Sequence, residues 1–190
     1  MKKIAILASG SGTNAQNIIE YFNKTFDKRV VLVCTNNPNA FVIERAKKAG
    51  VPVLIFNRKE WMEEQVVRNR LLNEKIDLVV LAGFLWLIPE TFIHAFPQRI
   101  INIHPALLPE YGGKGMYGMH VHEAVLKHHE KRSGITIHYV NEKYDAGEII
   151  FQAHCEVHGD DTPESLAKRI HALEYRYYPE VINQLLDSIQ

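Results

Sequence analysis

Short runs of apolar residues alternate along most of this chain with segments in which apolar residues recur at helical spacing. This alternation is typical of βαβ units and predicts an α/β fold with a mainly parallel, twisted sheet. The apolar run within 77–82 has no polar interruption, which favours a central strand that is buried on both faces. The predicted parallel strands are 3–8, 30–34, 51–56, 77–82 and a segment that ends at His104.

Helices are predicted between these strands. The first begins after a short loop, and its apolar residues fall on one stripe. That stripe comprises Ile18, Ile19, Phe22 and Phe26. Gly50 is placed to act as the C-cap of the second helix. The further helices are predicted at 41–49, 60–75 and 89–96.

The pattern changes after Pro105. Residues 111–118 are rich in glycine, so they predict a mobile loop next to the strand that ends at His104. The following residues predict a helix, two antiparallel strands and a long C-terminal helix whose cap is Thr162 or Asp161. These elements are predicted at 121–130, 134–140, 148–157 and 163–189. With no repeat or linker in the pattern, we predict one domain over residues 1–190.

Composition limits the classes of partner. The net charge is zero, with 22 basic and 22 acidic residues, whereas proteins that bind nucleic acid normally carry a basic excess. Cys34 and Cys155 are too few for a disulfide framework, which favours a reducing cytoplasm. The first apolar run reaches Gly10 too soon for a signal peptide, and no run is long enough to span a membrane. We therefore expect a cytoplasmic protein without nucleic-acid or membrane partners.

Polar side chains stand at the end of a predicted buried strand, in the segment Ile101-Asn102-Ile103-His104-Pro105. In an extended segment residues i and i+2 share a face, so Asn102 and His104 would lie side by side at the rim of the sheet. The turn around Asp145 could bring a carboxylate to that imidazole. Together they supply a hydrogen-bond donor, a titratable ring and a group that tunes the ring. For His104 alone, a satisfied polar group after a strand is the other interpretation.

The loop Ser9-Gly10-Ser11-Gly12-Thr13-Asn14 follows the first strand and opens a helix, where backbone N–H groups and the helix dipole attract an anion. A dinucleotide site would also need an acidic residue at the end of the second strand, but Cys34-Thr35-Asn36 stands there. We expect one phosphate at Gly12, Thr13 and Asn14. The alternative is a glycine turn that only lets the strand and the helix pack closely.

Two further features allow more than one interpretation. His120, His122, His128 and His129 invite a metal hypothesis, but no cluster joins three metal-ligand side chains, so no metal site is expected. Trp86 follows a buried strand at the same edge as His104. It belongs either to the core or to the wall of an apolar pocket for a flat heteroaromatic ligand.

The ordered motifs SGSGTN at 9–14, LAGF at 81–84, NIHPALLP at 102–109 and DAGEII at 145–150 belong to a match with a known family that covers nearly the whole chain. The set resembles the folate-dependent phosphoribosylglycinamide formyltransferase family. This resemblance implies a single-domain, Rossmann-like, three-layer formyltransferase fold with an antiparallel C-terminal part and a long C-terminal helix. It also implies formyl transfer from 10-formyltetrahydrofolate to the amine of N1-(5-phosphoribosyl)glycinamide in de novo purine biosynthesis.

The resemblance assigns roles by position. It implies that Asn102, His104 and Asp145 are catalytic, with Asn102 and His104 donating to the oxygen of a tetrahedral intermediate and Asp145 favouring the charged imidazole. The substrate phosphoribosyl group would bind at Gly12, Thr13, Asn14 and Glu174. The folate would bind at Arg58, Leu85, Trp86, Leu87, Ile88, Asn102, Asn141, Glu142, Lys143, Tyr144 and Asp145. No metal is needed, and the protein is expected to be a monomer or a homodimer.

Relatives that share the trio define the alternatives. A methionyl-tRNA formyltransferase would need a further C-terminal domain, and a formyltetrahydrofolate hydrolase normally carries an N-terminal regulatory domain, so both are less expected here. Another folate-dependent formyltransferase, and a binding module that has lost the chemistry, also remain open. The chain departs from the family in a longer loop at 110–119 and in Trp86, where some members carry a basic residue. The Leu108–Pro109 bond matches a place where the family can hold a cis bond.

Overall fold

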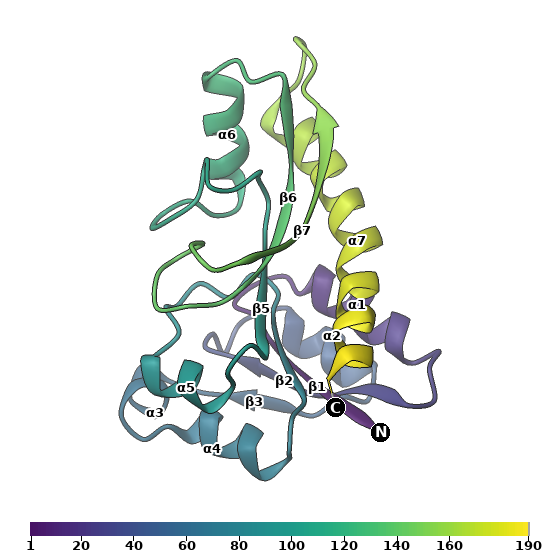
Figure 1. Ribbon diagram of the computed structural model, residues 1–190, viewed down its shortest axis with the longest axis vertical. Coiled ribbons are helices and arrows are strands. Elements are labelled where there is room, and N and C mark those ends of the chain that lie inside the picture. The colour runs from purple at the N-terminus through teal and green to yellow at the C-terminus, as the bar shows by residue number, and fades with distance from the viewer. Residues whose placement is uncertain (190) are drawn as a thin grey trace.

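A seven-stranded sheet forms the centre of the computed structural model, which describes residues 1–189 (Figure 1). Position 190, the last of the predicted domain 1–190, lies outside the described residues. The strands are β1 Lys2–Leu7, β2 Lys28–Thr35, β3 Val53–Ile55, β4 Leu78–Leu81, β5 Ile100–His104, β6 Arg132–Tyr139 and β7 Ile149–Glu156. Their order is β3-β2-β1-β4-β5-β6-β7, with parallel pairs up to β5 and antiparallel pairs beyond it.

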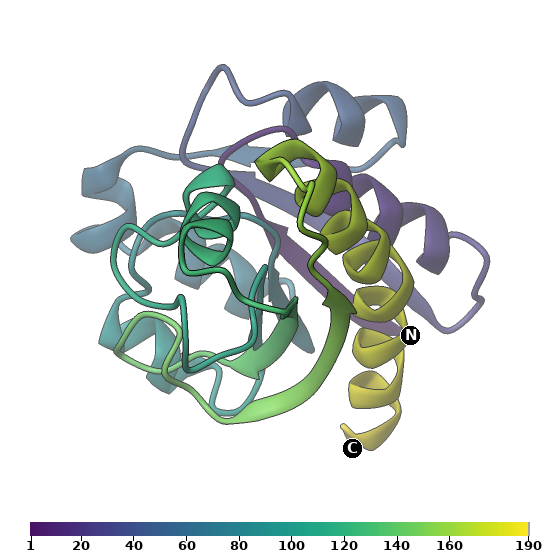
Figure 2. The same cartoon turned by 90° about the horizontal axis from the view of Figure 1, so that it is seen from above.

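Helices cover both faces of this sheet. They are α1 Thr13–Phe22, α2 Val42–Lys48, α3 Arg58–Met62, α4 Val66–Asn73, α5 Glu90–Ala95, α6 Met119–Lys127 and α7 Pro163–Ser188. One apolar cluster joins the sheet to α1, α2 and α7, and a second joins it to α3, α4 and α5. Figure 2 shows the yellow α7 lying beside the purple α1. The predicted three-layer α/β fold is confirmed.

The central strands are buried on both faces, as the unbroken apolar runs predicted. In β1, Ile4 and Ile6 belong to one cluster and Ala5 and Leu7 to the other. The long α7 crosses the sheet near β4, where the buried Tyr178 hydroxyl donates a hydrogen bond to the Leu81 carbonyl at 2.8 Å. This bond satisfies a polar group that burial would otherwise leave unpaired.

Two predicted elements differ from the structure. The helix predicted at 60–75 is two helices, α3 and α4, because Gln65 adopts a left-handed backbone (φ 54°) between them. Phe26 is not on the stripe of α1 and its side chain is fully exposed, at 101%. The helix ends at Phe22, and the chain then turns. The Thr25 hydroxyl stabilises this turn, because it lies within hydrogen-bond distance of the Phe22 and Lys28 carbonyls. The helical spacing of the apolar residues thus predicts one turn more than α1 has.

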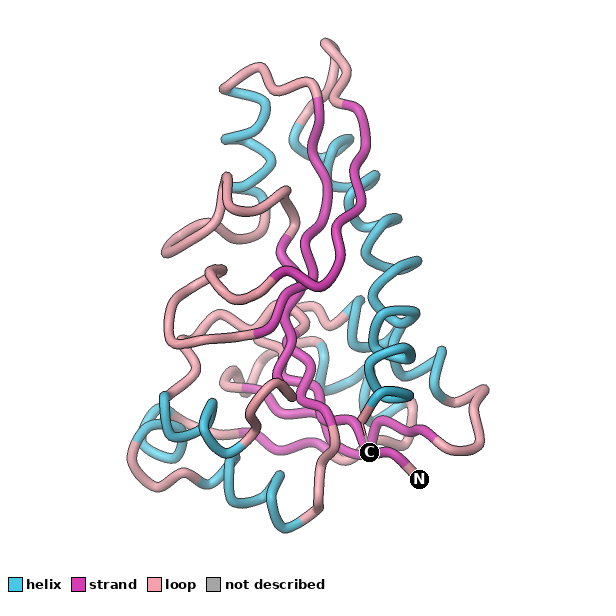
Figure 3. The backbone as a smooth tube through the Cα atoms, viewed as in Figure 1, coloured by secondary structure: helices cyan, strands magenta, loops and turns pink. Residues whose placement is uncertain are grey.

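The C-terminal part extends the sheet. Figure 3 shows β6 and β7 as a long magenta pair that reaches beyond the other strands. Thr162 is the cap of α7, because its side chain accepts a hydrogen bond from the Ser165 N–H, so Asp161 is not the cap. None of the helices within residues 1–189 combines the length and the apolarity needed to cross a bilayer. The ends of β1, β4 and β5 meet at one edge of the sheet, where the motifs lie.

Candidate active site

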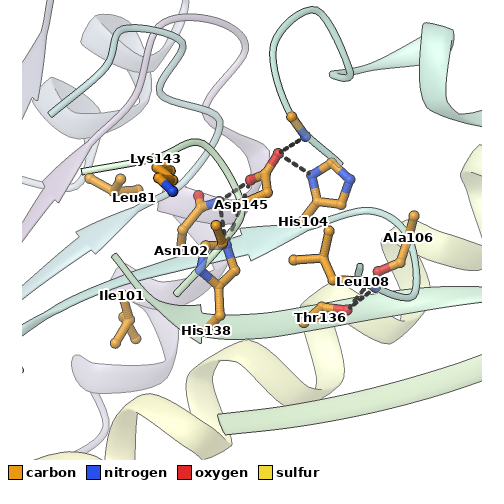
Figure 4. Close-up of polar contacts among 12 residues, drawn as sticks. Leu81, Ile101, Asn102, His104, Ala106, Leu108, Thr136, His138, Lys143 and Asp145 are labelled. Atoms are coloured by element: carbon orange, nitrogen blue, oxygen red, sulfur yellow. Dashed lines mark hydrogen bonds and ion pairs between the residues drawn. The ribbon is translucent and has the colours of Figure 1, made fainter. Parts of the chain in front are cut away.

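Strand β5 presents Asn102 and His104 on one face, while Ile101 and Ile103 pack into the core on the other. Asp145 comes from the turn between β6 and β7 and points back at both residues (Figure 4). The Asn102 Nδ2 lies 3.4 Å from the Asp145 Oδ1, and the His104 Nδ1 lies 3.5 Å from the Asp145 Oδ2. The structure thus brings the three predicted catalytic residues together.

A fourth residue, His138, joins this group and was not predicted. It lies opposite Asn102 in the antiparallel pair β5–β6, with its Nε2 at 3.2 Å from the Asn102 Nδ2 and 3.6 Å from the Asp145 Oδ1. Its Nδ1 lies 2.8 Å from the Tyr139 carbonyl, which can only accept, so Nδ1 carries a proton. The signal was a histidine in the apolar strand pattern of β6, but its partner depends on the strand register.

Burial and charge act against each other on these groups. Burial by itself would raise the pKa of the Asp145 carboxyl, but the His138 contact, His104 and the Gly113 N–H hold that pKa below its ordinary value. Burial lowers the pKa of the His104 imidazole, and Asp145 and the Tyr111 carbonyl oppose this effect without cancelling it. Asp145 is therefore an anion at neutral pH, surrounded by donors.

A pocket opens beside Asp145. Its lining combines apolar and aromatic side chains with a few polar ones, as expected for a small-molecule site. The lining residues are Leu81, Phe84, Trp86, Leu87, Ile88, Asn102, His138, Val140, Asn141, Lys143, Tyr144 and Asp145. His104 is not among them, because its ring is 3% exposed and both ring nitrogens face protein oxygens.

Most of the residues predicted to bind folate line this pocket. Three do not. Leu85 points toward solvent, Glu142 lies 4.0 Å from the His94 ring, and the Arg58 guanidinium stacks over the Trp86 ring at 5.5 Å. Trp86 itself is half-buried and lines the pocket, so it is a wall residue as well as a neighbour of the aromatic core.

The glycine loop after β1 forms the cap of α1 near the same edge. Gly12 has a left-handed backbone (φ 73°). Thr13 and Asn14 open the helix, so their N–H groups face the loop side of α1. The Asn14 Nδ2 donates to the Glu174 Oε2 of α7 at 2.9 Å. Among the described residues the buried Asn14 Oδ1 has no partner, which leaves an acceptor beside the proposed phosphate turn.

We expect Gly12→Ala to destroy this turn. An added Cβ would lie 2.4 Å from the Val42 Cγ2 and 2.7 Å from its Cα, in a backbone conformation that alanine disfavours. The KM for the phosphoribosyl substrate that the resemblance implies should rise at least about tenfold, and the melting temperature should fall. Gly10→Ala is the matched control, because nothing lies within 4 Å of a Cβ there. Equal KM values in the two variants would contradict the phosphate assignment.

Glu174 should make the stability of the ligand-free protein depend on pH. Burial raises the pKa of its carboxyl to about 7 from the ordinary 4.5, and the Asn14 hydrogen bond only partly opposes this. The folded state therefore holds the proton more tightly than the unfolded state. As the pH rises through this interval, the free energy of unfolding should fall by on the order of 3 kcal/mol.

The measurement is urea unfolding of the wild type and of Glu174→Gln at several pH values between those limits. The variant cannot titrate at this position, so its curve should be flatter than the wild-type curve. Parallel curves would show that Glu174 is not the group responsible.

The structure also bears on the metal hypothesis, on the Leu108–Pro109 bond and on the residues that follow His104. Within residues 1–189, no three His, Cys, Asp or Glu side chains are grouped to hold a metal ion, and the metal-free mechanism stays a prediction. The Leu108–Pro109 bond is cis. The residues that follow His104 are tied to β6, because the Thr136 hydroxyl donates to the Ala106 carbonyl and accepts from the Leu108 N–H (Figure 4).

Known proteins resemble this chain in sequence. The sequence model of the formyl transferase family matches residues 2–182. A phosphoribosylglycinamide formyltransferase from Bacillus subtilis is 39% identical, covering 98% of this chain and 95% of the relative. A chloroplastic one from Arabidopsis thaliana is 42% identical over 98% of this chain, which spans 66% of that relative's length.

Solved structures agree with the sequence relatives. The phosphoribosylglycinamide formyltransferase of Bacillus halodurans superposes with a TM-score of 0.89 at 38% identity, covering 100% of this chain and 97% of the other. Glycinamide ribonucleotide transformylase 1 of Symbiobacterium toebii gives 0.90 at 37% identity, with 99% and 89% covered. From the motifs, the fold and these matches together, the chain belongs to the phosphoribosylglycinamide formyltransferase family.

Proposed function

We propose that this protein transfers the formyl group of 10-formyltetrahydrofolate to the free amine of N1-(5-phosphoribosyl)glycinamide, a step of de novo purine biosynthesis. One observation carries the proposal. Asn102 and Asp145 lie at the polar end of an aromatic-walled pocket, at the sheet edge that also holds the Gly12 turn. A flat donor and a phosphorylated acceptor could therefore meet there.

The reaction needs an oxyanion donor and a proton acceptor. The amine nitrogen attacks the formyl carbon and forms the new C–N bond, while the carbonyl oxygen gains negative charge. The Asn102 Nδ2 donates to that oxygen. Asp145, anionic in this site, takes the amine proton, directly or through water, and the proton leaves on the folate N10 as the old C–N bond breaks.

His104 acts through Asp145 in this geometry. Its Nδ1 faces the carboxylate at 3.5 Å, so the ring stabilises the anion whenever that nitrogen carries a proton. Direct donation from His104 to the formyl oxygen, as the resemblance implies, stays a prediction. His138 holds the Asn102 amide from the opposite strand and limits its rotation.

The binding roles follow the same layout. Gly12, Thr13 and Asn14 hold the phosphoribosyl group with help from Glu174, whose side chain is fixed by Asn14. The folate lies along Trp86, Leu87 and Ile88, beneath the turn 141–145. Action in the cytoplasm as a monomer or homodimer, without metal or nucleic acid, stays a prediction from the sequence.

Purified protein, incubated with 10-formyltetrahydrofolate and glycinamide ribonucleotide, tests the proposal. Mass spectrometry should show one formylated ribonucleotide for each tetrahydrofolate formed. Formate released at the same rate without the amine acceptor would instead indicate a hydrolase. Binding of both substrates with no turnover would indicate a module that has lost the chemistry.

A further inference from the structure

The glycine-rich segment 110–118 contacts the His104–Asp145 pair through its backbone. The Tyr111 carbonyl accepts a hydrogen bond from the His104 Nε2 at 2.7 Å, and the Gly113 N–H donates to the Asp145 Oδ2 at 3.0 Å. The imidazole therefore has an oxygen acceptor at each nitrogen, the carbonyl on one side and the carboxylate on the other. A ring with a proton on both nitrogens satisfies both acceptors, whereas a neutral ring leaves a lone pair against an oxygen.

The shape of the segment is held at two points. At Gly112 an added Cβ would lie 2.5 Å from the Leu108 Cδ2 and 3.2 Å from the Asp145 Cβ, so a side chain there would displace the Leu108 methyl group and press on Asp145. Tyr111 adopts a left-handed backbone (φ 54°), which is unfavourable for a residue with a large side chain. Such a conformation persists only where the surroundings hold it.

The Tyr111 side chain supplies that hold. Its hydroxyl donates to the Glu130 Oε1 at 2.7 Å, and its ring packs against the core between the sheet and α7. Glu130 follows the end of α6, so the contact ties the glycine-rich segment to a regular element. Losing this bond would let Tyr111 relax toward an ordinary backbone conformation and move its carbonyl away from His104.

The other groups that face His104 do not replace this carbonyl. His138 on β6 opposes a positive charge on the His104 ring, whereas burial lowers the pKa of the His122 ring on α6 to about 4, so His122 carries no charge near neutral pH. Asp145 is the anion beside the ring. The carboxylate and the Tyr111 carbonyl are therefore the contacts that oppose burial and favour the protonated ring.

We propose that Tyr111 is a positioning residue for formyl transfer: its hydroxyl, bonded to Glu130, holds its own carbonyl on the His104 Nε2, and this contact helps the ring to carry its second proton beside Asp145. The kinetic consequence rests on the proposed function, but the contact itself does not. The backbone of the glycine-rich segment then holds the His104–Asp145 pair in place, and the Tyr111–Glu130 hydrogen bond fixes that backbone.

The kinetic test compares Tyr111→Phe and Glu130→Ala with the wild type across the pH range. Loss of the Tyr111–Glu130 hydrogen bond should move the basic limb of the kcat–pH profile to lower pH by about one unit. Above that limb kcat should be about tenfold lower, and the KM of each substrate should stay within about twofold. The double variant should lose no more than either single variant, because both remove the same contact.

Two variants serve as controls. Glu130→Gln keeps an oxygen that accepts from the Tyr111 hydroxyl, so its profile should match the wild type. Tyr117→Phe removes a hydroxyl from the exposed part of the same segment and should change nothing. A profile of Glu130→Gln like that of Glu130→Ala would show that charge, and not the hydrogen bond, carries the effect, and would overturn the proposal.

The His104 ring can also be titrated directly in ligand-free protein that contains ¹³C-labelled histidine. Its signal is assigned by its absence in His104→Gln. The pKa of the ring should fall by about one unit in Tyr111→Phe and stay unchanged in Tyr117→Phe. An unchanged pKa, or a faster enzyme, would overturn the proposal. This measurement of the ring pKa needs no turnover. A wild-type protein that transfers no formyl group would therefore refute the proposed function but not the role of the Tyr111 contact.

Discussion

Asp145→Asn should lower kcat by on the order of 10²- to 10⁴-fold, the range expected when a proton acceptor is lost. The carboxylate lies between the His104 and His138 rings and also faces the Asn102 amide and the Gly113 N–H. An amide at this position cannot take the amine proton. Its NH₂ group would also face one of these donors. Steady-state formyl transfer at saturating substrates measures the loss.

Two controls distinguish a loss of catalysis in Asp145→Asn from a loss of folding. The circular dichroism spectrum and the melting curve of the variant should remain those of a folded protein. Glu148→Gln removes the same charge from an exposed position at the other end of the same turn, so its turnover should stay normal. Near-normal turnover of Asp145→Asn would refute the role of the acid.

Asn102→Ala should lower kcat by on the order of 10²- to 10³-fold, with a smaller effect on either KM. In the proposed mechanism the amide donates to the formyl oxygen as negative charge develops there. It is held in place by the Asp145 Oδ1 at 3.4 Å and by His138 on the facing strand. Because the interaction strengthens only in the transition state, its loss should affect the chemical step and leave substrate binding nearly intact.

The control for Asn102→Ala is Asn69→Ala, which makes the same change at an exposed position of α4. Isothermal titration with the folate should give the same affinity for wild type and Asn102→Ala. A tenfold rise in the folate KM at unchanged kcat would mean that Asn102 binds the donor and does not stabilise the oxyanion.

The fold was predictable because local patterns determine most of it. Apolar runs indicated the strands, and the period-two spacing of Asn102 and His104 placed both on one face of β5. The break between α3 and α4 was missed because Gln65 is an ordinary helix former that here takes a left-handed backbone. That choice depends on how the two short helices pack, which a local pattern does not contain.

The candidate site was predictable only where side chains carry the signal. Asp145 stood in a turn between two predicted strands, so its proximity to His104 could be proposed. His138 was missed because its place opposite Asn102 depends on the register of the antiparallel pair. The contact from the Tyr111 carbonyl has no side-chain signal, since every residue has such a carbonyl and only the path of the loop selects this one.

The most direct test is a crystal structure with glycinamide ribonucleotide and an unreactive analogue of the formyl donor bound together. The account predicts the phosphate on the turn formed by Gly12, Thr13 and Asn14, and the amine and formyl carbon between the Asn102 amide and the Asp145 carboxylate. An amine held beyond hydrogen-bond reach of both groups, with no ordered water bridging the gap, would contradict it.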